Sequence, residues 1–121
     1  MSANTMAKMV NGIADNLLLS VIRAWDTTGV VDMGFKTQKP MIFAALDMDA
    51  CMYRHPVTEK QLKVVRDQWG WSESNPEGWV TVLPPIEKSL ARGDVDTGSM
   101  MDWRDIVTVI QNYVAGSMQK P

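Results

Sequence analysis

The sequence predicts a mostly α protein: a compact bundle of four or five helices, with one short strand near residues 79–83 left undecided. An α+β domain is the alternative. Two observations favour the bundle. Apolar residues recur at spacings of three and four along most of the chain, which is the period of one buried helix face. The 121 residues also include ten Met and five Trp, bulky side chains that fill irregular spaces between packed helices.

Size and composition predict a single globular domain over residues 1–121. A chain of this length buries roughly two-thirds of the surface of its unfolded form, and 45% apolar with 21% charged residues is ordinary for a folded domain. The single cysteine, Cys51, cannot form an internal disulfide, so we expect a reducing, cytoplasmic location. Residues 17–22, the longest dense apolar stretch, fall far short of the ~20 residues that span a bilayer. No membrane association is expected.

Residues 4–25 predict one long central helix. Ser2, Asn4 or Thr5 stands where a residue would cap its start, and the recurring apolar positions predict a stripe that faces the core. That stripe consists of Met6, Met9, Val10, Ile13, Leu17, Val21 and Trp25. Residues 26–39 are rich in Gly and Thr and predict a loop.

A second helix is predicted from Pro40 to Tyr53, because proline is tolerated at a first helical position. We expect one face of this helix to pack against the central helix through its apolar side chains. That face carries Met41, Ala44, Ala45, Met48, Cys51 and Met52.

A third, short helix is predicted over residues 58–70. Thr58 and Gln61 form a capping box at its start, and Gly70 supplies its end. In the following segment, Trp71–Leu83, turn-forming residues precede a β-prone run over residues 79–83. For this run the sequence favours neither strand nor loop.

Two further helices complete the predicted bundle. Residues 85–93 open with a proline and end with a glycine. The last helix starts near Ser99, which with Asp102 resembles a capping pair, and ends at Gly116. We expect a continuous buried stripe on it, made of Trp103, Ile106, Val107, Ile110, Tyr113 and Val114.

The string MIFAALDMDA contains Asp47 and Asp49. It resembles the strand-end Asp-x-Asp of haloacid-dehalogenase-type phosphotransferases and the metal-binding Asp-x-Asp of glycosyltransferases. The resemblance implies two carboxylates that hold one divalent metal on a loop, one of which attacks phosphorus. A helical spacing would instead send these side chains about 200° apart. We therefore predict no catalytic residue, and a phosphotransferase-like enzyme is the third hypothesis for function.

Four aspartates stand at positions 1, 3, 9 and 12 of a segment between two predicted helices, as ligands of a calcium loop would. These are Asp94, Asp96, Asp102 and Asp105. Helix capping and the helix dipole explain the same residues, so the sequence leaves calcium binding open. His55 is the only imidazole, which excludes a two-histidine metal site. We predict no metal site and no cofactor.

By elimination, we predict that the protein acts through a protein-contact surface and is not an enzyme. Aromatic residues and Met are enriched at the centres of interfaces. The chain would then be a small accessory protein of phage or mobile-element type, such as an inhibitor, an adaptor or an assembly subunit, that binds a protein partner or itself. The predicted contact residues are Trp71, Trp79, Met48 and Met52.

A helix-turn-helix-like DNA-binding regulator is the alternative. Lys60, Lys63 and Arg66 share the third predicted helix, but Glu59 and Asp67 lie four residues from Lys63 and neutralise the strip. The formal net charge of −2 also creates no basic field that would attract a phosphate backbone. Nucleic acid is therefore the less favoured partner.

Overall fold

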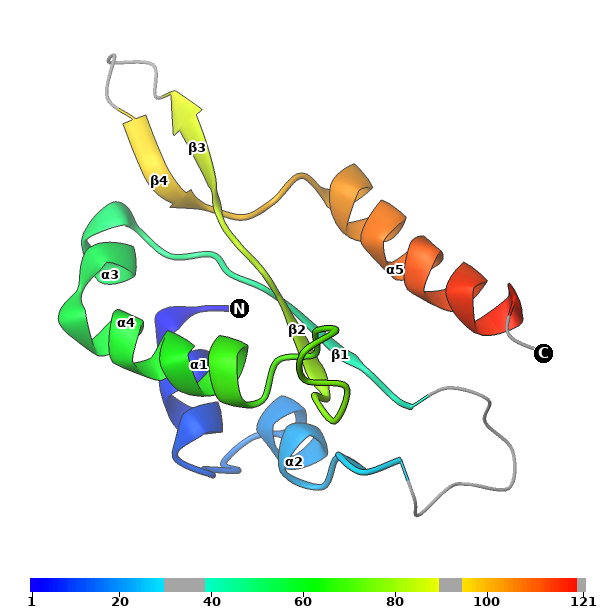
Figure 1. The fold of residues 1–121 in the computed structure, drawn as a ribbon. Helices are drawn as coiled ribbons and strands as arrows, with labels where there is room; N and C mark the ends of the chain where they lie inside the picture. Colours follow the sequence, from blue (N-terminus) through cyan, green and yellow to red (C-terminus); the bar gives the residue numbers. More distant parts are fainter. Residues whose placement is uncertain (30–38, 90–94, 120–121) are drawn as a thin grey trace.

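The computed structural model describes residues 1–29, 39–89 and 95–119 of the chain. Helices and strands alternate along it (Figure 1). In chain order they are α1 (Ala3–Val10), α2 (Leu17–Arg23), β1 (Ile42–Ala45), α3 (Ala50–Arg54), α4 (Pro56–Leu62), the π-helix η1 (Lys63–Gln68), β2 (Val80–Leu83), β3 (Ile86–Ser89), β4 (Val95–Ser99) and α5 (Trp103–Gln119).

The strands β1 and β2 form a parallel pair, with Ile42 opposite Val80 and Ala45 opposite Leu83. The helices α3, α4 and η1 make the crossover between them, as a parallel connection requires. The predicted helical bundle is therefore wrong. Every residue from 41 to 46 is apolar, and such a run fits a helix face as well as a strand that is buried on both sides.

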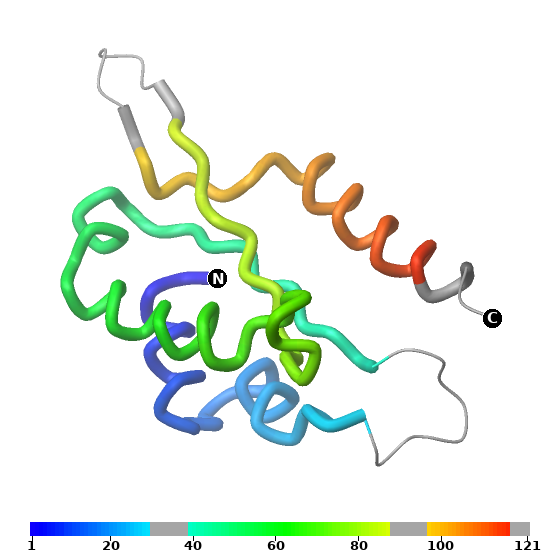
Figure 2. Tube along the Cα trace, in the orientation of Figure 1, coloured from blue at the N-terminus to red at the C-terminus, as the bar shows by residue number. Residues whose placement is uncertain are grey.

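Helices cover both faces of this parallel pair (Figures 1 and 2). On one face, Ala44 belongs to a buried core with Met6 of α1 and Leu19 of α2. On the other face, the ring of Phe43 meets Tyr113 of α5 edge-on, with the ring centroids 5.5 Å apart. Successive side chains of a strand point to opposite faces, so β1 separates two helical layers.

The predicted central helix over residues 4–25 is in fact two helices. The chain turns at Gly12, whose φ of 72° is left-handed and suits glycine best. Asn16 then caps α2, because its side chain accepts a hydrogen bond of 2.8 Å from the Leu19 amide. The apolar spacing runs through this break without marking it, so the pattern alone could not locate the turn.

The predicted third helix is confirmed as α4 and η1, which run on without interruption from Pro56 to Gln68. His55 caps it, with Nδ1 accepting a hydrogen bond from the Val57 amide at 3.1 Å. Thr58 does not cap this helix: its hydroxyl donates to the Met52 carbonyl. The helix nonetheless ends where predicted, since a Cβ on Gly70 would lie 2.0 Å from the Arg66 carbonyl oxygen.

The segment before the last helix contains strands and not a helix. The undecided run near residues 79–83 is strand β2. The helix predicted over residues 85–93 is wrong in its described part, because β3 pairs antiparallel with β4, with a bulge between Ile86 and Lys88. Residues 90–93 of that prediction lie outside the described ranges.

The last helix is confirmed as α5, but its predicted buried stripe is wrong. Ile106 and Tyr113 are half-buried, whereas Trp103 is 64% exposed and Val114 is 50% exposed. The apolar periodicity identified the helix correctly but could not show what covers its apolar face. No helix in the described ranges is long and apolar enough to cross a membrane.

Candidate functional site

The candidate site lies where the two parallel strands end. The carboxyl ends of parallel strands meet at one edge of a sheet, and ligands of open α/β sheets bind at that edge. Here Ala45 and Leu83 end their strands side by side. The chain continues from β1 into residues 46–49, which we call the edge loop.

Buried and exposed residues alternate along the edge loop. Leu46 and Met48 are buried, while Asp47 and Asp49 are exposed. Two main-chain hydrogen bonds hold the loop: the Leu46 amide donates to the Leu83 carbonyl at 3.2 Å, and the Met48 amide donates to the Gly98 carbonyl at 3.0 Å. The two carboxylates are thus presented to solvent by a fixed backbone.

Asp49 has a structural role at this edge. Its Oδ1 accepts a hydrogen bond of 2.9 Å from the Met52 amide and so caps α3. The helical spacing predicted for Asp47 and Asp49 is wrong, because both follow a strand. Within residues 1–29, 39–89 and 95–119, no three His, Cys, Asp or Glu side chains gather where they could hold a metal ion.

The first residues of the chain lie against the same edge. The Met1 main-chain nitrogen donates to the Ala45 carbonyl, and the Asp47 amide donates to the Met1 carbonyl at 2.9 Å. Ser2 then caps α1 by accepting a hydrogen bond of 3.1 Å from the Thr5 amide. The sequence marks Ser2 as a capping residue, but its position beside the edge loop arises only from tertiary packing.

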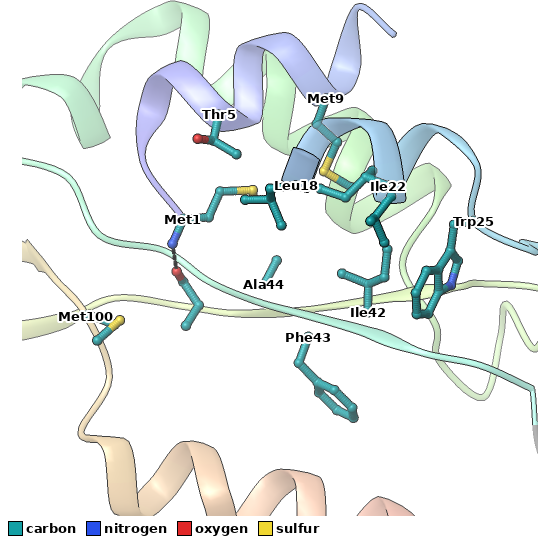
Figure 3. A pocket seen from close by; sticks show the side chains of 12 residues that line it. Met1, Thr5, Met9, Leu18, Ile22, Trp25, Ile42, Phe43, Ala44 and Met100 are labelled. Carbon is teal, nitrogen blue, oxygen red and sulfur yellow. Dashed lines mark hydrogen bonds between the residues drawn. The ribbon is translucent and has the colours of Figure 1, made fainter. Parts of the chain in front are cut away.

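A cavity of about 420 Å³ opens beside β1, under α1 and α2 (Figure 3). Leu18 and Ile22 of α2 reach into it, and Ala44 closes its floor. Thr5 carries the only hydroxyl group among the residues that line it; the others are Met1, Met9, Leu18, Val21, Ile22, Trp25, Ile42, Phe43, Ala44, Ala45 and Met100. An apolar lining of this kind suits apolar side chains or a flat ring better than a charged group.

The four predicted contact residues differ in their burial. Trp79 is half-buried against Trp69, with the ring centroids 5.3 Å apart, and Met48 is in the core. Trp71 and Met52 are about half exposed. The shared face predicted for Met48 and Met52 is wrong, because the helix that would create it is absent, and a contact role for Trp71 and Met52 stays a prediction.

The structure also bears on the predicted calcium loop and on the basic strip of the third predicted helix. Asp102 acts as a helix cap, since its Oδ1 accepts a hydrogen bond of 2.9 Å from the Arg104 amide. Asp94 lies outside the described ranges, so the calcium loop is not described as a whole. In the basic strip, Arg66 pairs with Asp67 at 2.9 Å and lowers the pKa of that carboxyl through this hydrogen bond. The strand β2 follows this helix, where a helix-turn-helix needs a recognition helix.

Comparison with known proteins relates this chain to a family. The model of the Flavoprotein family matches residues 1–115. The solved structure of a PPC decarboxylase Cys→Ser mutant complexed with pantothenoylaminoethenethiol superposes with a TM-score of 0.71 and 35% identity over 95% of this chain and 52% of that chain. The solved FMN binding protein AtHal3 gives a TM-score of 0.67 and 35% identity over 93% of this chain and 50% of that chain.

A curated relative is also named for a decarboxylase. The phosphopantothenoylcysteine decarboxylase subunit SIS2 of Saccharomyces cerevisiae is 34% identical over 117 residues, which are 96% of this chain and 17% of the relative. The chain therefore spans about half of the solved chains and a smaller part of this relative. Because SIS2 is named as a subunit, the expectation of a protein partner agrees with the comparisons at this general level.

These matches correct the predicted function. The chain is not a phage-type inhibitor or accessory protein, a DNA-binding regulator or an Asp-x-Asp phosphotransferase, because the proteins it resembles are flavoproteins and decarboxylases with a Rossmann-like parallel sheet. The expectation of a non-enzyme is overturned by the same names. One signal could have found the fold: an apolar run over residues 41–46 and a β-prone run over residues 79–83, separated by a helical segment long enough for a parallel crossover.

Proposed function

The chain belongs to the Flavoprotein family, and from that premise we propose that it forms part of an FMN-binding decarboxylase that acts on phosphopantothenoylcysteine or a close analogue. The observation that carries the proposal is the likeness to PPC decarboxylase, which extends over nearly the whole chain. We assign the edge loop as the part of the reaction site that this chain contributes, since ligands of this type of sheet bind at the carboxyl ends of its strands.

The described residues fit one portion of FMN only. The dimethylbenzene half of the isoalloxazine ring is flat and apolar, and the cavity beside β1 offers it Leu18, Ile22 and Trp25. A phosphate needs cations or several aligned N–H donors, and none of the residues that line this cavity is a Lys or Arg. This cavity alone therefore does not make a complete FMN site, and we assign the phosphate contacts to the part of the domain that the chain does not span.

The edge loop supports a role in holding substrate. Asp47 and Asp49 are the exposed side chains of a backbone that Leu83 and Gly98 fix from two sides. Carboxylates accept hydrogen bonds, and the amide and hydroxyl groups of a pantothenoyl substrate can donate them. Asp49 already accepts one such bond from Met52 through Oδ1, which leaves Oδ2 available to a ligand.

The proposal is tested by assembling the chain with the remainder of AtHal3 that it does not match, and by measuring FMN binding from flavin absorbance and CO2 release from phosphopantothenoylcysteine. Asp49→Asn keeps the capping oxygen but removes the charge, and we expect it to lower kcat/KM about tenfold with FMN binding retained. Glu73→Gln is the matched control, because Glu73 is exposed in the turn that precedes β2, at the other end of the sheet. An assembled protein that binds no FMN would disprove the proposal.

A further inference from the structure

A second cavity, of about 330 Å³, lies between the end of α1, α2 and the start of β2 (Figure 1). Trp79 lines it and immediately precedes β2, where its carbonyl accepts a hydrogen bond of 3.1 Å from the Ile42 amide. The cavity is therefore at the amino ends of the strands, whereas the edge loop is at their carboxyl ends. Met9 and Ile22 separate it from the cavity beside β1, since they line both. We call it the tryptophan cavity; its volume is at the low end of the ~300–1,000 Å³ of small-molecule sites.

Two half-buried indole rings, those of Trp69 and Trp79, line this cavity together. Their centroids are 5.3 Å apart and their planes are tilted by 33°. The main chain holds the pair, because the Trp79 amide donates to the Trp69 carbonyl at 3.0 Å. The side-chain amide of Asn75 donates to the Gln68 and Gly70 carbonyls at 3.2 and 2.8 Å, which fixes the chain on both sides of Trp69. Two aromatic faces fixed in this way offer a flat ring a pre-formed surface.

The π-helix η1 determines where Trp69 lies. The Trp69 amide donates to the carbonyl of Val64, five residues earlier, at 3.0 Å, where an α-helix would use the residue four positions back. Each residue of an α-helix turns the chain by about 100°, so this wider winding changes the direction in which Trp69 leaves the helix. Such π-helical turns are rare and frequently occur at functional sites. The irregular winding thus coincides with a wall of the tryptophan cavity.

Arg23 supplies a positive charge to the same cavity. It is exposed in the last turn of α2 and is the only charged residue among those that line the cavity. In the part of the chain that the structure describes, no carboxylate forms an ion pair with it. Its Nε lies 3.6 Å from where a Cβ on Gly12 would be, so the guanidinium group lies beside bare main chain. An arginine without a carboxylate partner can bind a phosphate or carboxylate through two parallel N–H groups.

We propose that the tryptophan cavity binds a small ligand in which a flat aromatic ring carries a phosphate or carboxylate group. The ring packs against Trp69 and Trp79, and the anionic group binds Arg23. The hydroxyl of Thr27 and the side-chain amide of Asn11, which also line the cavity, can bond to polar atoms of the ligand. A nucleoside monophosphate and an aryl carboxylate share this chemistry. The inference concerns a site apart from the edge loop and does not rest on the decarboxylase activity proposed above.

Titration of the full chain with AMP or phenylacetate, followed through the NMR resonances of its five indole N–H groups, tests the inference. We expect the resonances of Trp69 and Trp79 to shift, while those of Trp71 and Trp103, which do not line the cavity, stay in place. Adenosine lacks the phosphate and ribose 5-phosphate lacks the ring, so each should bind at least about tenfold more weakly than AMP. The probe that saturates at the lower concentration identifies the anionic group. If neither probe shifts the Trp69 and Trp79 resonances, the inference is overturned.

Matched variants separate the two parts of the site. Arg23→Gln should weaken binding of the better probe at least about tenfold. Arg54→Gln is its control, because Arg54 also stands in the last turn of a helix but does not line the cavity. Trp79→Leu should weaken binding at least about fivefold, whereas Trp79→Phe keeps a flat ring and should retain most of it. Equal weakening by the two arginine variants, or equal loss in both Trp79 variants, would contradict the proposed contacts.

FMN is itself a flat ring with a phosphate, so the same resonances must distinguish it from the proposed ligand. Trp25 lines the cavity beside β1 and not the tryptophan cavity. If FMN shifted the Trp69 and Trp79 resonances and left that of Trp25 unchanged, the tryptophan cavity would be the cofactor site and the inference of a separate ligand would be overturned. Conversely, AMP binding by this chain when the assembled protein binds no FMN would refute the proposed function and leave this inference standing.

Discussion

Gly98 and Met48 are in main-chain contact. The Met48 amide donates to the Gly98 carbonyl at 3.0 Å, and a Cβ atom on Gly98 would lie only 1.8 Å from the Met48 carbonyl oxygen. No side chain fits in that space, so glycine is required for β4 to approach the edge loop. The hairpin of β3 and β4 thereby fixes the backbone that presents Asp47 and Asp49.

Gly98→Ala should destabilise the fold by roughly 1–3 kcal/mol, because a methyl group forced into this contact must displace backbone. Urea denaturation followed by far-UV circular dichroism measures the change. Gly116→Ala is the matched control: no atom lies within 4 Å of the added carbon, and in helix α5 the substitution should stabilise by about 0.5–1 kcal/mol. Equal stability of the Gly98 variant and the original chain would contradict the close approach.

Tyr113→Phe should cost about 1 kcal/mol at neutral pH, since the tyrosine hydroxyl donates a hydrogen bond of 2.6 Å to the Lys39 carbonyl. Burial also raises the pKa of Tyr113 above its usual value of 10.0. A raised pKa means that the folded state holds the proton more tightly, so this stabilisation is complete below the unfolded pKa and is lost as pH rises through the folded one.

The pH dependence provides the check for Tyr113. Between pH 8 and pH 11, the original chain should lose more stability in urea than Tyr113→Phe does, because the variant has no phenol to ionise. A parallel decline of the two proteins over this range would show that the hydroxyl is not held in the folded state.

Cys51 should react rapidly with a thiol reagent under native conditions. The sequence predicted a buried position on a helix face, but the structure leaves Cys51 exposed on α3. Mixing the folded chain with a chromogenic disulfide should give a rate within about tenfold of that in denaturant. A reaction rate that rises a thousandfold on unfolding would show that Cys51 is buried in the folded chain.

Ile110→Ala should change the stability of the chain by less than about 1 kcal/mol, because Ile110 is partly exposed on α5 and its truncation leaves little cavity. Leu19→Ala is the contrasting change: Leu19 is fully buried between α1 and the sheet, and its truncation should cost roughly 2–5 kcal/mol. Chemical denaturation of both variants measures the difference. A large loss for Ile110→Ala would mean that the apolar face of α5 is covered within the folded chain.

The sequence predicted correctly those elements that short-range interactions determine. The helix over residues 58–70 and α5 were both recognised, because apolar spacing and terminal glycine or capping residues act within a few turns. The strand β1 was mistaken for a helix because residues 41–46 are apolar throughout, and only pairing with β2 decides between the two structures.

The sequence predicted which residues stand at the candidate site but not how they are arranged. It marks Asp47 and Asp49 as notable carboxylates, but the helix predicted over residues 40–53 would have placed their side chains on different faces, whereas both follow strand β1. The contributions of Met1 and Gly98 depend on contacts between segments that lie far apart in the sequence, and no spacing rule reports such contacts. The apolar face of α5 shows a related limit: periodicity indicates that a helix has an apolar face, but it does not show which part of the protein packs against that face.

The parallel pairing of β1 with β2 also sets the order in which this chain can fold. The paired residues lie about 40 positions apart in the sequence, so closing the pair costs more chain entropy than forming any helix. The helices α3, α4 and η1, which lie between the two strands, can form from local contacts first. The edge that presents Asp47 and Asp49 exists only once this pairing has closed, so a chain whose two strands are unpaired lacks the site.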